Sequence, residues 1–178
     1  MIAQQIKNRL SQISPKSINT NKKAAVMLIL CNDPLEIVYT VRSKELKNHP
    51  GEVSFPGGMQ ENNESMVETA VRETEEEIGL KEIEILGDFY NVKGKSGVGV
   101  STIVGYKPCV NIEELNLNPD EVSKAFLVPI HNLVFQDKLK IRTYFFKKHV
   151  IWGLTGFITN RFIGDVYKET EFYKTLNK

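Results

Sequence analysis

The sequence is poor in cysteine and histidine, the residues that most often build zinc sites and nucleophilic triads. Its two cysteines, Cys31 and Cys109, each lie among apolar neighbours, and no CxxC motif is present. We expect both to be buried free thiols, which is typical of a reducing compartment. The three histidines, His49, His131 and His149, are scattered along the chain. None has partners at the spacing that a zinc site or a histidine-activated nucleophile needs.

Long apolar runs and an excess of charge of one sign are also missing. No run of 18 apolar residues occurs, so the sequence predicts no membrane-spanning helix. The formal net charge is +1, which gives no overall field that would favour nucleic acid or an anionic membrane as a partner. The first ten residues lack the apolar core of a signal peptide. We therefore expect a cytoplasmic protein with neither a nucleic-acid nor a membrane partner.

The chain of 178 residues is long enough for one domain with a sizeable core. We expect an N-terminal helix and linker over residues 1–22, with the helix ended by Pro15, and a main domain over residues 23–178. A further helix is expected from Gly153 to about Tyr173. The expected strands are Ala24–Leu30, Glu36–Arg42, Ile83–Tyr90, Ser101–Val110, Ala125–Ile130, Ile141–Phe146 and Val150–Trp152. This order of elements predicts an α/β fold in which a mixed sheet lies between helices.

The stretch from Gly57 to Leu80 predicts a glycine turn followed by a glutamate-rich helix. Asn62 and Asn63 are suitable N-cap residues, and Glu64 follows where the positive end of a helix dipole favours a carboxylate. Gly79 stands where a glycine commonly ends a helix in the left-handed conformation.

Three carboxylates share one face of this expected helix. At about 100° per residue, Glu73, Glu76 and Glu77 fall within one arc. The apolar residues, together with Thr74, form a separate face that can pack on a sheet: Val67, Ala70, Val71, Thr74 and Ile78. A solvated acidic face is the ordinary interpretation of such a pattern. The alternative is a Mg²⁺ site, because this cation prefers oxygen ligands and commonly lies between carboxylates and substrate phosphates.

The same stretch resembles the Nudix box, whose pattern is G-x5-E-x7-R-E-U-x-E-E-x-G-U, with U a bulky aliphatic residue. The positions that match are Gly58, Glu64, Arg72, Glu73, Glu76, Glu77, Gly79 and Leu80. Thr74 replaces one aliphatic residue, and since it lies on the expected core face the change concerns packing rather than ligands. So many fixed positions at the right spacing make the match highly specific. The resemblance implies a Nudix-type α/β/α sandwich.

A second resemblance, to the coenzyme A pyrophosphatase branch of the Nudix hydrolases, covers residues 38–58. That signature is close to L-L-T-x-R-[SA]-x3-R-x3-G-x3-F-P-G-G. The matching positions are Thr40, Arg42, Ser43, Gly51, Phe55, Pro56, Gly57 and Gly58. Lys47 replaces an arginine, and lysine offers phosphate a point charge instead of a bidentate fork. The segments Pro119–Val122 and Ile151–Gly156 also look like this branch.

These resemblances imply a phosphoanhydride hydrolase that uses Mg²⁺ or Mn²⁺. The implied metal ligands are Glu73, Glu76, Glu77 and the carbonyl of Gly58. The implied catalytic residues are Glu76, as ligand or general base, Glu73, and Arg72, which orients the carboxylates. The implied substrate-binding residues are Arg42, Lys47, Phe55, Gly57 and Gly58. In some Nudix enzymes the base comes from a distant loop, which here points to Glu113, Glu114, Asp120 or Glu121.

The implied substrate is coenzyme A or an acyl derivative, cleaved to 3′,5′-ADP and 4′-phosphopantetheine. A Nudix hydrolase for another nucleoside diphosphate derivative, such as ADP-ribose, a dinucleotide or a nucleoside triphosphate, stays open. A binding module without activity is a third alternative, although the glutamate set is intact. A homodimer through a shared sheet or an exchanged N-terminal helix also stays open, since nothing in the sequence decides the oligomeric state.

Overall fold

The structure is a computed structural model that describes residues 1–94, 96–138 and 141–176. Its helices are α1 (Ile2–Leu10), α2 (Met66–Ile78), α3 (Gly153–Asp165) and α4 (Glu171–Leu176). Its strands are β1 (Lys23–Cys31), β2 (Glu36–Arg42), β3 (Val53–Ser54), β4 (Gly57–Met59), β5 (Glu84–Lys93), β6 (Gly99–Lys107), β7 (Val122–Pro129), β8 (Val134–Lys138), β9 (Ile141–Phe146) and β10 (His149–Ile151). Single turns of 3-10 helix span Ile112–Glu114, Ile130–Asn132 and Tyr167–Glu169.

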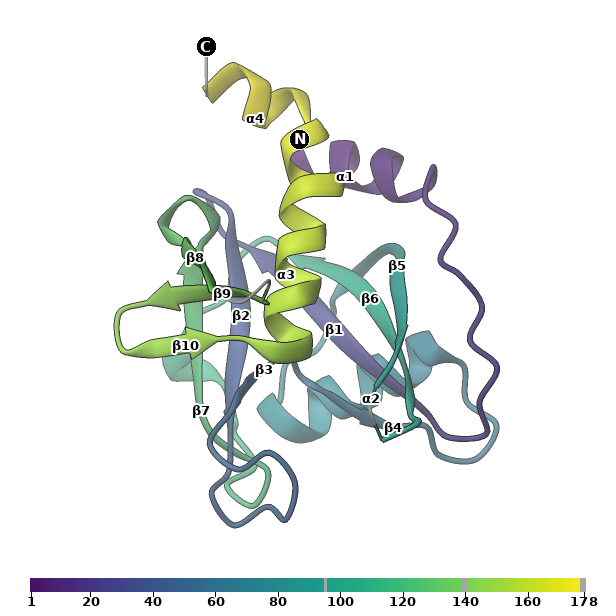
Figure 1. The fold of residues 1–178 in the computed structure, drawn as a ribbon. Helices are drawn as coiled ribbons and strands as arrows, with labels where there is room; N and C mark the ends of the chain where they lie inside the picture. Colours follow the sequence, from purple (N-terminus) through teal and green to yellow (C-terminus); the bar gives the residue numbers. More distant parts are fainter. Residues whose placement is uncertain (95, 139–140, 177–178) are drawn as a thin grey trace.

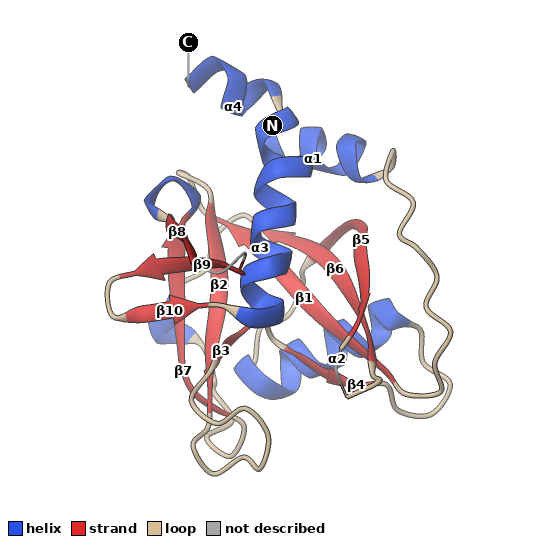
Figure 2. Cartoon of the chain, viewed as in Figure 1, coloured by secondary structure: helices blue, strands red, loops and turns tan. Residues whose placement is uncertain are grey.

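A mixed sheet forms the centre of the molecule, as the sequence predicts (Figure 1). Its main path runs β3-β2-β1-β6-β5, with β4 paired to β1 and β7 paired to β2. Strand β1 is parallel to β6 and antiparallel to β2 and β4. A separate sheet of three strands has the order β10-β9-β8. Helices cover both faces of the main sheet, so the fold is an α/β sandwich (Figure 2).

Strand β1 reads as a continuous apolar run because both of its faces are covered. Leu28 and Leu30 face a core that also contains residues of α1 and α3. Met27 and Ile29 face the opposite core, which is closed by Ala70 and Ile78 of α2. The period-2 alternation of a strand therefore divides β1 between two cores. Helix α2, with its glutamates, lies on the second of these faces.

The start of α2 is set by Ser65 and not by Asn62 or Asn63. Ser65 and Glu68 form a capping box, in which Ser65 Oγ accepts from the Glu68 N–H and the Glu68 carboxylate accepts from the Ser65 N–H at 2.7 Å. The predicted N-cap was therefore wrong, and Glu64 precedes the helix. Gly79 ends the helix as predicted, at φ +68.

The buried stripe of α2 differs from the predicted apolar face. Val71 is exposed, whereas Ala70, Thr74 and Ile78 are fully buried as predicted. The stripe continues on the other side through Thr69, Glu73 and Glu77. Thr74 satisfies its hydroxyl by donating to the carbonyl of Ala70 at 2.7 Å. The helix is thus rotated so that two of its carboxylates point toward the sheet.

The predicted C-terminal helix is broken into α3, a 3-10 turn and α4. Val166 and Tyr167 leave the helical path and are buried in the first core. Thr170 then accepts from the Tyr173 N–H with its hydroxyl oxygen, which begins a new helix. The sequence prediction also missed the strands β3 and β8, and it missed β4, which it took for part of a turn.

Burial and helix length bear on three further expectations. Cys31 is buried as expected, but Cys109 is exposed because it follows the end of β6. Within residues 1–94, 96–138 and 141–176, no helix is long and apolar enough to span a membrane. The predicted N-terminal helix is present as α1, which buries Ile6 and Leu10 in the first core, but it ends at Leu10 and not at Pro15.

Candidate metal centre

Three carboxylates from two distant parts of the chain meet beside the second core. Glu73 and Glu77 come from adjacent turns of α2, and Glu121 comes from the loop before β7. Each offers an oxygen within 4.8 Å of the others. Glu73 is 9 % exposed and Glu77 is 4 % exposed, so these are not members of a solvated acidic face. Carboxylates brought together and buried repel one another, which a divalent cation between them would reverse.

The glycine turn lies against this cluster. Gly58 in β4 pairs with Ala25 of β1, and a Cβ at position 58 would overlap the Glu73 carboxylate. The Gly57 N–H points to Glu77 Oε2 at 3.4 Å. Glycine is needed here because any side chain at position 58 would occupy the space beside the carboxylates. A donor set made of carboxylate oxygens alone fits Mg²⁺ or Mn²⁺.

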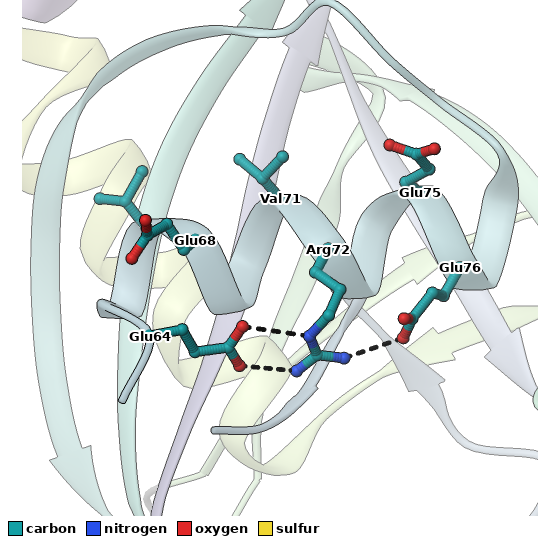
Figure 3. Close-up of a pocket in the computed structure, with 7 residues that line it drawn as sticks. Glu64, Glu68, Val71, Arg72, Glu75 and Glu76 are labelled. Atoms are coloured by element: carbon teal, nitrogen blue, oxygen red, sulfur yellow. Dashed lines mark hydrogen bonds and ion pairs between the residues drawn. The ribbon is translucent and has the colours of Figure 1, made fainter. Parts of the chain in front are cut away.

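Arg72 is hydrogen-bonded to Glu64 and Glu76, as Figure 3 shows, and also to Glu73 of the cluster. Its guanidinium donates to Glu64 through Nε at 3.1 Å and through Nη2 at 2.8 Å. Its Nη1 donates to Glu73 Oε1 at 3.0 Å and to Glu76 Oε2 at 2.8 Å. Nη2 also donates to the carbonyl of Met59, the last residue of β4. The planar fork therefore ties the glycine turn to α2 and orients the Glu73 carboxylate.

Glu76 lies apart from the three clustered carboxylates. Its side chain is 52 % exposed and is held by Arg72 at the rim of the site. On the outward side of α2, a shallow hollow of about 610 Å³ is lined by Glu64, Val67, Glu68, Val71, Arg72, Glu75 and Glu76. Figure 3 shows Glu76 on this outer flank. The helical period places Glu73, Glu76 and Glu77 on one face of α2, but only Glu73 and Glu77 are buried.

Burial sets the protonation of the clustered carboxylates in the metal-free protein. It raises the pKa of Glu77 to about 8, against the opposing charge of Arg42. It also raises the pKa of Glu73, against the hydrogen bond from Arg72. The pKa of Glu64 is lowered to about 2, first of all by the hydrogen bonds from Arg72. Glu77 therefore tends to hold a proton that a metal ion would displace, and the burial of Glu73 favours its protonated form in the same direction.

The residues expected to bind substrate fall into two groups. Arg42 lies at the end of β2, close enough to lower the pKa of Glu77, and its buried Nε has no hydrogen-bond partner among the described residues. Lys47 is exposed in the loop between β2 and β3. Phe55 is 3 % exposed and stacks on Tyr39 at 5.1 Å between ring centroids, within the first core. The structure thus brings Arg42 to the carboxylates and places Phe55 on the opposite face of the sheet.

Of the four distant acids that sequence considerations left open, Glu121 alone joins the cluster within the described residues. Glu113 and Glu114 lie in an exposed 3-10 turn, and Asp120 is exposed. A hydrogen bond from Ser43 holds the main chain of Glu121: the Ser43 N–H donates to the Glu121 carbonyl at 2.8 Å. The only signal in the sequence was the short segment Pro119–Val122, which does not say which acid points inward.

Comparisons with known proteins agree with this arrangement. A family model described as the NUDIX domain matches residues 21–149. A protein of Photorhabdus laumondii described as an uncharacterized Nudix hydrolase, NudL, is 32 % identical over 164 residues, which cover 83 % of this chain and 87 % of that protein. A protein of Yersinia pestis with the same description is 32 % identical over 155 residues, covering 78 % of this chain and 77 % of its own.

Solved structures share the fold at lower identity. A MutT/nudix family protein from Enterococcus faecalis superposes with a TM-score of 0.55 at 18 % identity, over 94 % of this chain and 67 % of that one. The Nudix hydrolase RenU from M. smegmatis gives a TM-score of 0.53 at 16 % identity, over 65 % of this chain and 74 % of its own. At these identities the likeness concerns the fold alone.

Proposed function

The chain belongs to the Nudix hydrolase family, and on that premise we propose that it hydrolyses the diphosphate of coenzyme A or of an acyl derivative. The products are 3′,5′-ADP and the corresponding 4′-phosphopantetheine. The observation that carries the hydrolytic part is the cluster of Glu73, Glu77 and Glu121 against the Gly57–Gly58 turn. The choice of coenzyme A rests on the signature over residues 38–58.

The cation proposed for this site is Mg²⁺ or Mn²⁺. Glu73, Glu77 and Glu121 hold it through carboxylate oxygens, and the carbonyl of Gly58 is a further ligand. When bound, such an ion neutralises the charge of the diphosphate and lowers the pKa of a water molecule. Because Gly58 has no side chain, the Glu73 carboxylate lies directly against the backbone of the glycine turn, next to the carbonyl proposed as a ligand.

Glu76 is proposed as the general base that takes the proton of the attacking water. It stands at the rim of the site, where its exposed carboxylate can exchange the proton with solvent. Arg72 fixes its position through a hydrogen bond of 2.8 Å and orients Glu73 in the same way. The water then attacks one phosphorus in line with the leaving phosphate, as in other phosphoryl transfers.

Arg42 is proposed to bind a phosphate of the substrate. Its buried Nε–H has no partner among the described residues, and an unpaired buried donor of this kind is costly unless a ligand satisfies it. Lys47, on the adjacent loop, supplies a second positive charge to the separate 3′-phosphate or to the diphosphate. Both residues lie in the segment whose pattern suggests coenzyme A.

A substrate panel tests the proposal. Purified protein with Mg²⁺ or Mn²⁺ is incubated with coenzyme A, dephospho-coenzyme A, ADP-ribose and NADH, and the products are identified by mass. We expect coenzyme A to be cleaved with the highest kcat/KM, giving 3′,5′-ADP and 4′-phosphopantetheine. Faster cleavage of ADP-ribose or NADH would support a Nudix hydrolase for another nucleoside diphosphate. Binding without turnover of any member of the panel would indicate a module without activity.

A further inference from the structure

Glu121 reaches the carboxylate cluster from a loop, so its position depends on the contacts that hold this loop against the rest of the protein. The loop between β6 and β7 crosses the C-terminal end of α2. Leu115 and Leu117 pack against the second core. Asn116 lies so close to Gly79 that a Cβ on the glycine would meet the Asn116 Cβ at 2.9 Å. The left-handed glycine that ends α2 therefore also lets this loop approach the helix.

Asn118 makes contacts with both parts of the cluster. Its backbone N–H donates to the Glu77 carbonyl at 2.9 Å, which satisfies one of the carbonyl groups left open at the end of α2. Its side-chain Nδ2 donates to Glu121 Oε1 at 3.2 Å. One residue thus links the main chain of one clustered glutamate to the carboxylate of another.

The same side chain also shapes the turn that carries Glu121. Asn118 Oδ1 accepts from the Asp120 N–H at 3.2 Å, and the Asn118 carbonyl accepts from the N–H groups of Glu121 and Val122 at 3.1 Å and 2.8 Å. An asparagine that bonds the backbone two residues ahead is a common way to set a turn. The backbone carbonyl and the side-chain amide of Asn118 therefore both help to fix the direction of the Glu121 side chain.

We propose that Asn118 is a positioning residue for the metal site, which holds Glu121 Oε1 so that the other oxygen is presented to a divalent cation beside Glu73 and Glu77. This inference rests on the proposed function, because it takes the cluster to be a metal site. A free glutamate side chain loses rotamer entropy when it is ordered, and a hydrogen bond made in advance removes that cost from metal binding. Groups that orient metal ligands in this way commonly change metal affinity by about 10- to 100-fold when they are removed.

The chain contains a matched control. Asn111, at the other end of the same loop, donates through Nδ2 to Glu114 at 2.9 Å and accepts from the Glu113 N–H at 3.1 Å. It therefore repeats the hydrogen-bond pattern of Asn118 with an acid three residues ahead. Glu114 is exposed and outside the cluster. Asn111→Ala removes an equivalent pair of hydrogen bonds without touching the proposed ligands.

The experiment is a titration of the full chain with Mn²⁺ alone, in which free Mn²⁺ is measured by electron paramagnetic resonance and no substrate is present. We expect Asn118→Ala to raise the Kd for Mn²⁺ about tenfold and Asn111→Ala to leave it unchanged. Asn118→Ser retains a hydroxyl that can accept the Asp120 N–H, so it keeps the turn while removing the amide. We expect it to weaken Mn²⁺ binding in the same way, with a circular dichroism spectrum like that of the wild type.

A double-mutant cycle separates positioning from mere support of the loop. In a Glu121→Gln background, Asn118→Ala should cause less than about a twofold further loss of Mn²⁺ affinity, since its effect passes through Glu121. An equal loss in both backgrounds, or wild-type affinity in the Asn118 variants, would overturn the inference and leave the metal site intact. A wild-type protein that binds no Mn²⁺ would overturn both the inference and the proposed function.

Discussion

Arg72 and Glu64 are joined by two nearly parallel hydrogen bonds, of 3.1 Å from Nε and 2.8 Å from Nη2. The pair anchors one edge of the guanidinium, so that Nη1 is left to hold Glu73 and Glu76. Lysine has one ammonium group and cannot reproduce this fork. We expect Arg72→Lys to reduce kcat/KM about 10- to 100-fold, as measured on coenzyme A.

The control for that substitution is Arg161→Lys, which alters a similar ion pair with Asp165 on α3, away from the carboxylates. It should leave kcat/KM close to the wild-type value. Equal losses in the two variants would show that the fork at Arg72 has no special role.

The second prediction concerns Glu77, the most buried of the clustered carboxylates. Glu77→Gln retains the shape of the side chain but removes the charge that holds a cation. We expect turnover to fall by about 100-fold or more while the far-ultraviolet circular dichroism spectrum is unchanged. Glu75→Gln, on the exposed side of the same helix, is the control and should keep full activity. Wild-type turnover by Glu77→Gln would remove Glu77 from the site.

The third prediction follows from the pKa of Glu77, which burial raises from 4.5 to about 8 in the metal-free protein. Between these values the folded state holds a proton that the unfolded state has released. The free energy of unfolding of the metal-free protein should therefore fall as the pH rises through this window, by at most about 1.4 kcal/mol per pH unit for this group. Thermal unfolding with a chelator present should show this slope, and Glu77→Gln should remove most of it.

Adding Mg²⁺ should reverse the trend, because the ion binds the deprotonated carboxylates and its affinity rises with pH. A metal-free protein whose melting temperature increases from about pH 5 to pH 8 would contradict the predicted burial of this carboxylate.

The fourth prediction separates the base from the ligands. Glu76→Gln should lower kcat strongly at an unchanged Kd for Mn²⁺, because Glu76 lies outside the cluster. Glu121→Gln should raise the Kd for Mn²⁺, and part of its activity should return at high Mn²⁺. The two variants are compared by kinetics over a range of Mn²⁺ concentrations. If Glu76→Gln weakened Mn²⁺ binding and Glu121→Gln lowered only kcat, Glu76 would be the ligand and Glu121 the base.

The fifth prediction concerns the lysine at the usual arginine position of the coenzyme A signature. Lys47→Arg should lower the KM for coenzyme A by up to about tenfold, which is the effect of one additional charge-assisted hydrogen bond. The neighbouring Lys44→Arg, also exposed, is the matched control and should have no effect. An unchanged KM for coenzyme A in Lys47→Arg would place residue 47 outside the substrate site.

The sequence alone predicts the carboxylates of α2, because the helical period that brings Glu73 and Glu77 together is a local property. It also predicts the end of α2 at Gly79 and the mixed sheet. It does not predict which flank of α2, next to the apolar residues, is buried together with them. That depends on the docking of α2 on the sheet, which buries Glu73 and exposes Val71.

Other features depend on contacts between distant parts of the chain. Glu121 is far from Glu77 in sequence, and only the crossing of the β6–β7 loop over the end of α2 brings them together. Asn118 carries no signal of its own, since many asparagines set turns. The N-cap of α2 was misassigned because Asn62, Asn63 and Ser65 are all good caps, and the capping box with Glu68 decides between them.

The most direct measurement is a crystal structure with Mn²⁺ and a non-hydrolysable diphosphate analogue, in which the ion is located by its anomalous scattering. We expect a peak bounded by the carboxylates of Glu73, Glu77 and Glu121, with the analogue entering beside Gly58. A peak on the outer flank of α2 between Glu64 and Glu76, with the three clustered carboxylates unligated, would contradict it.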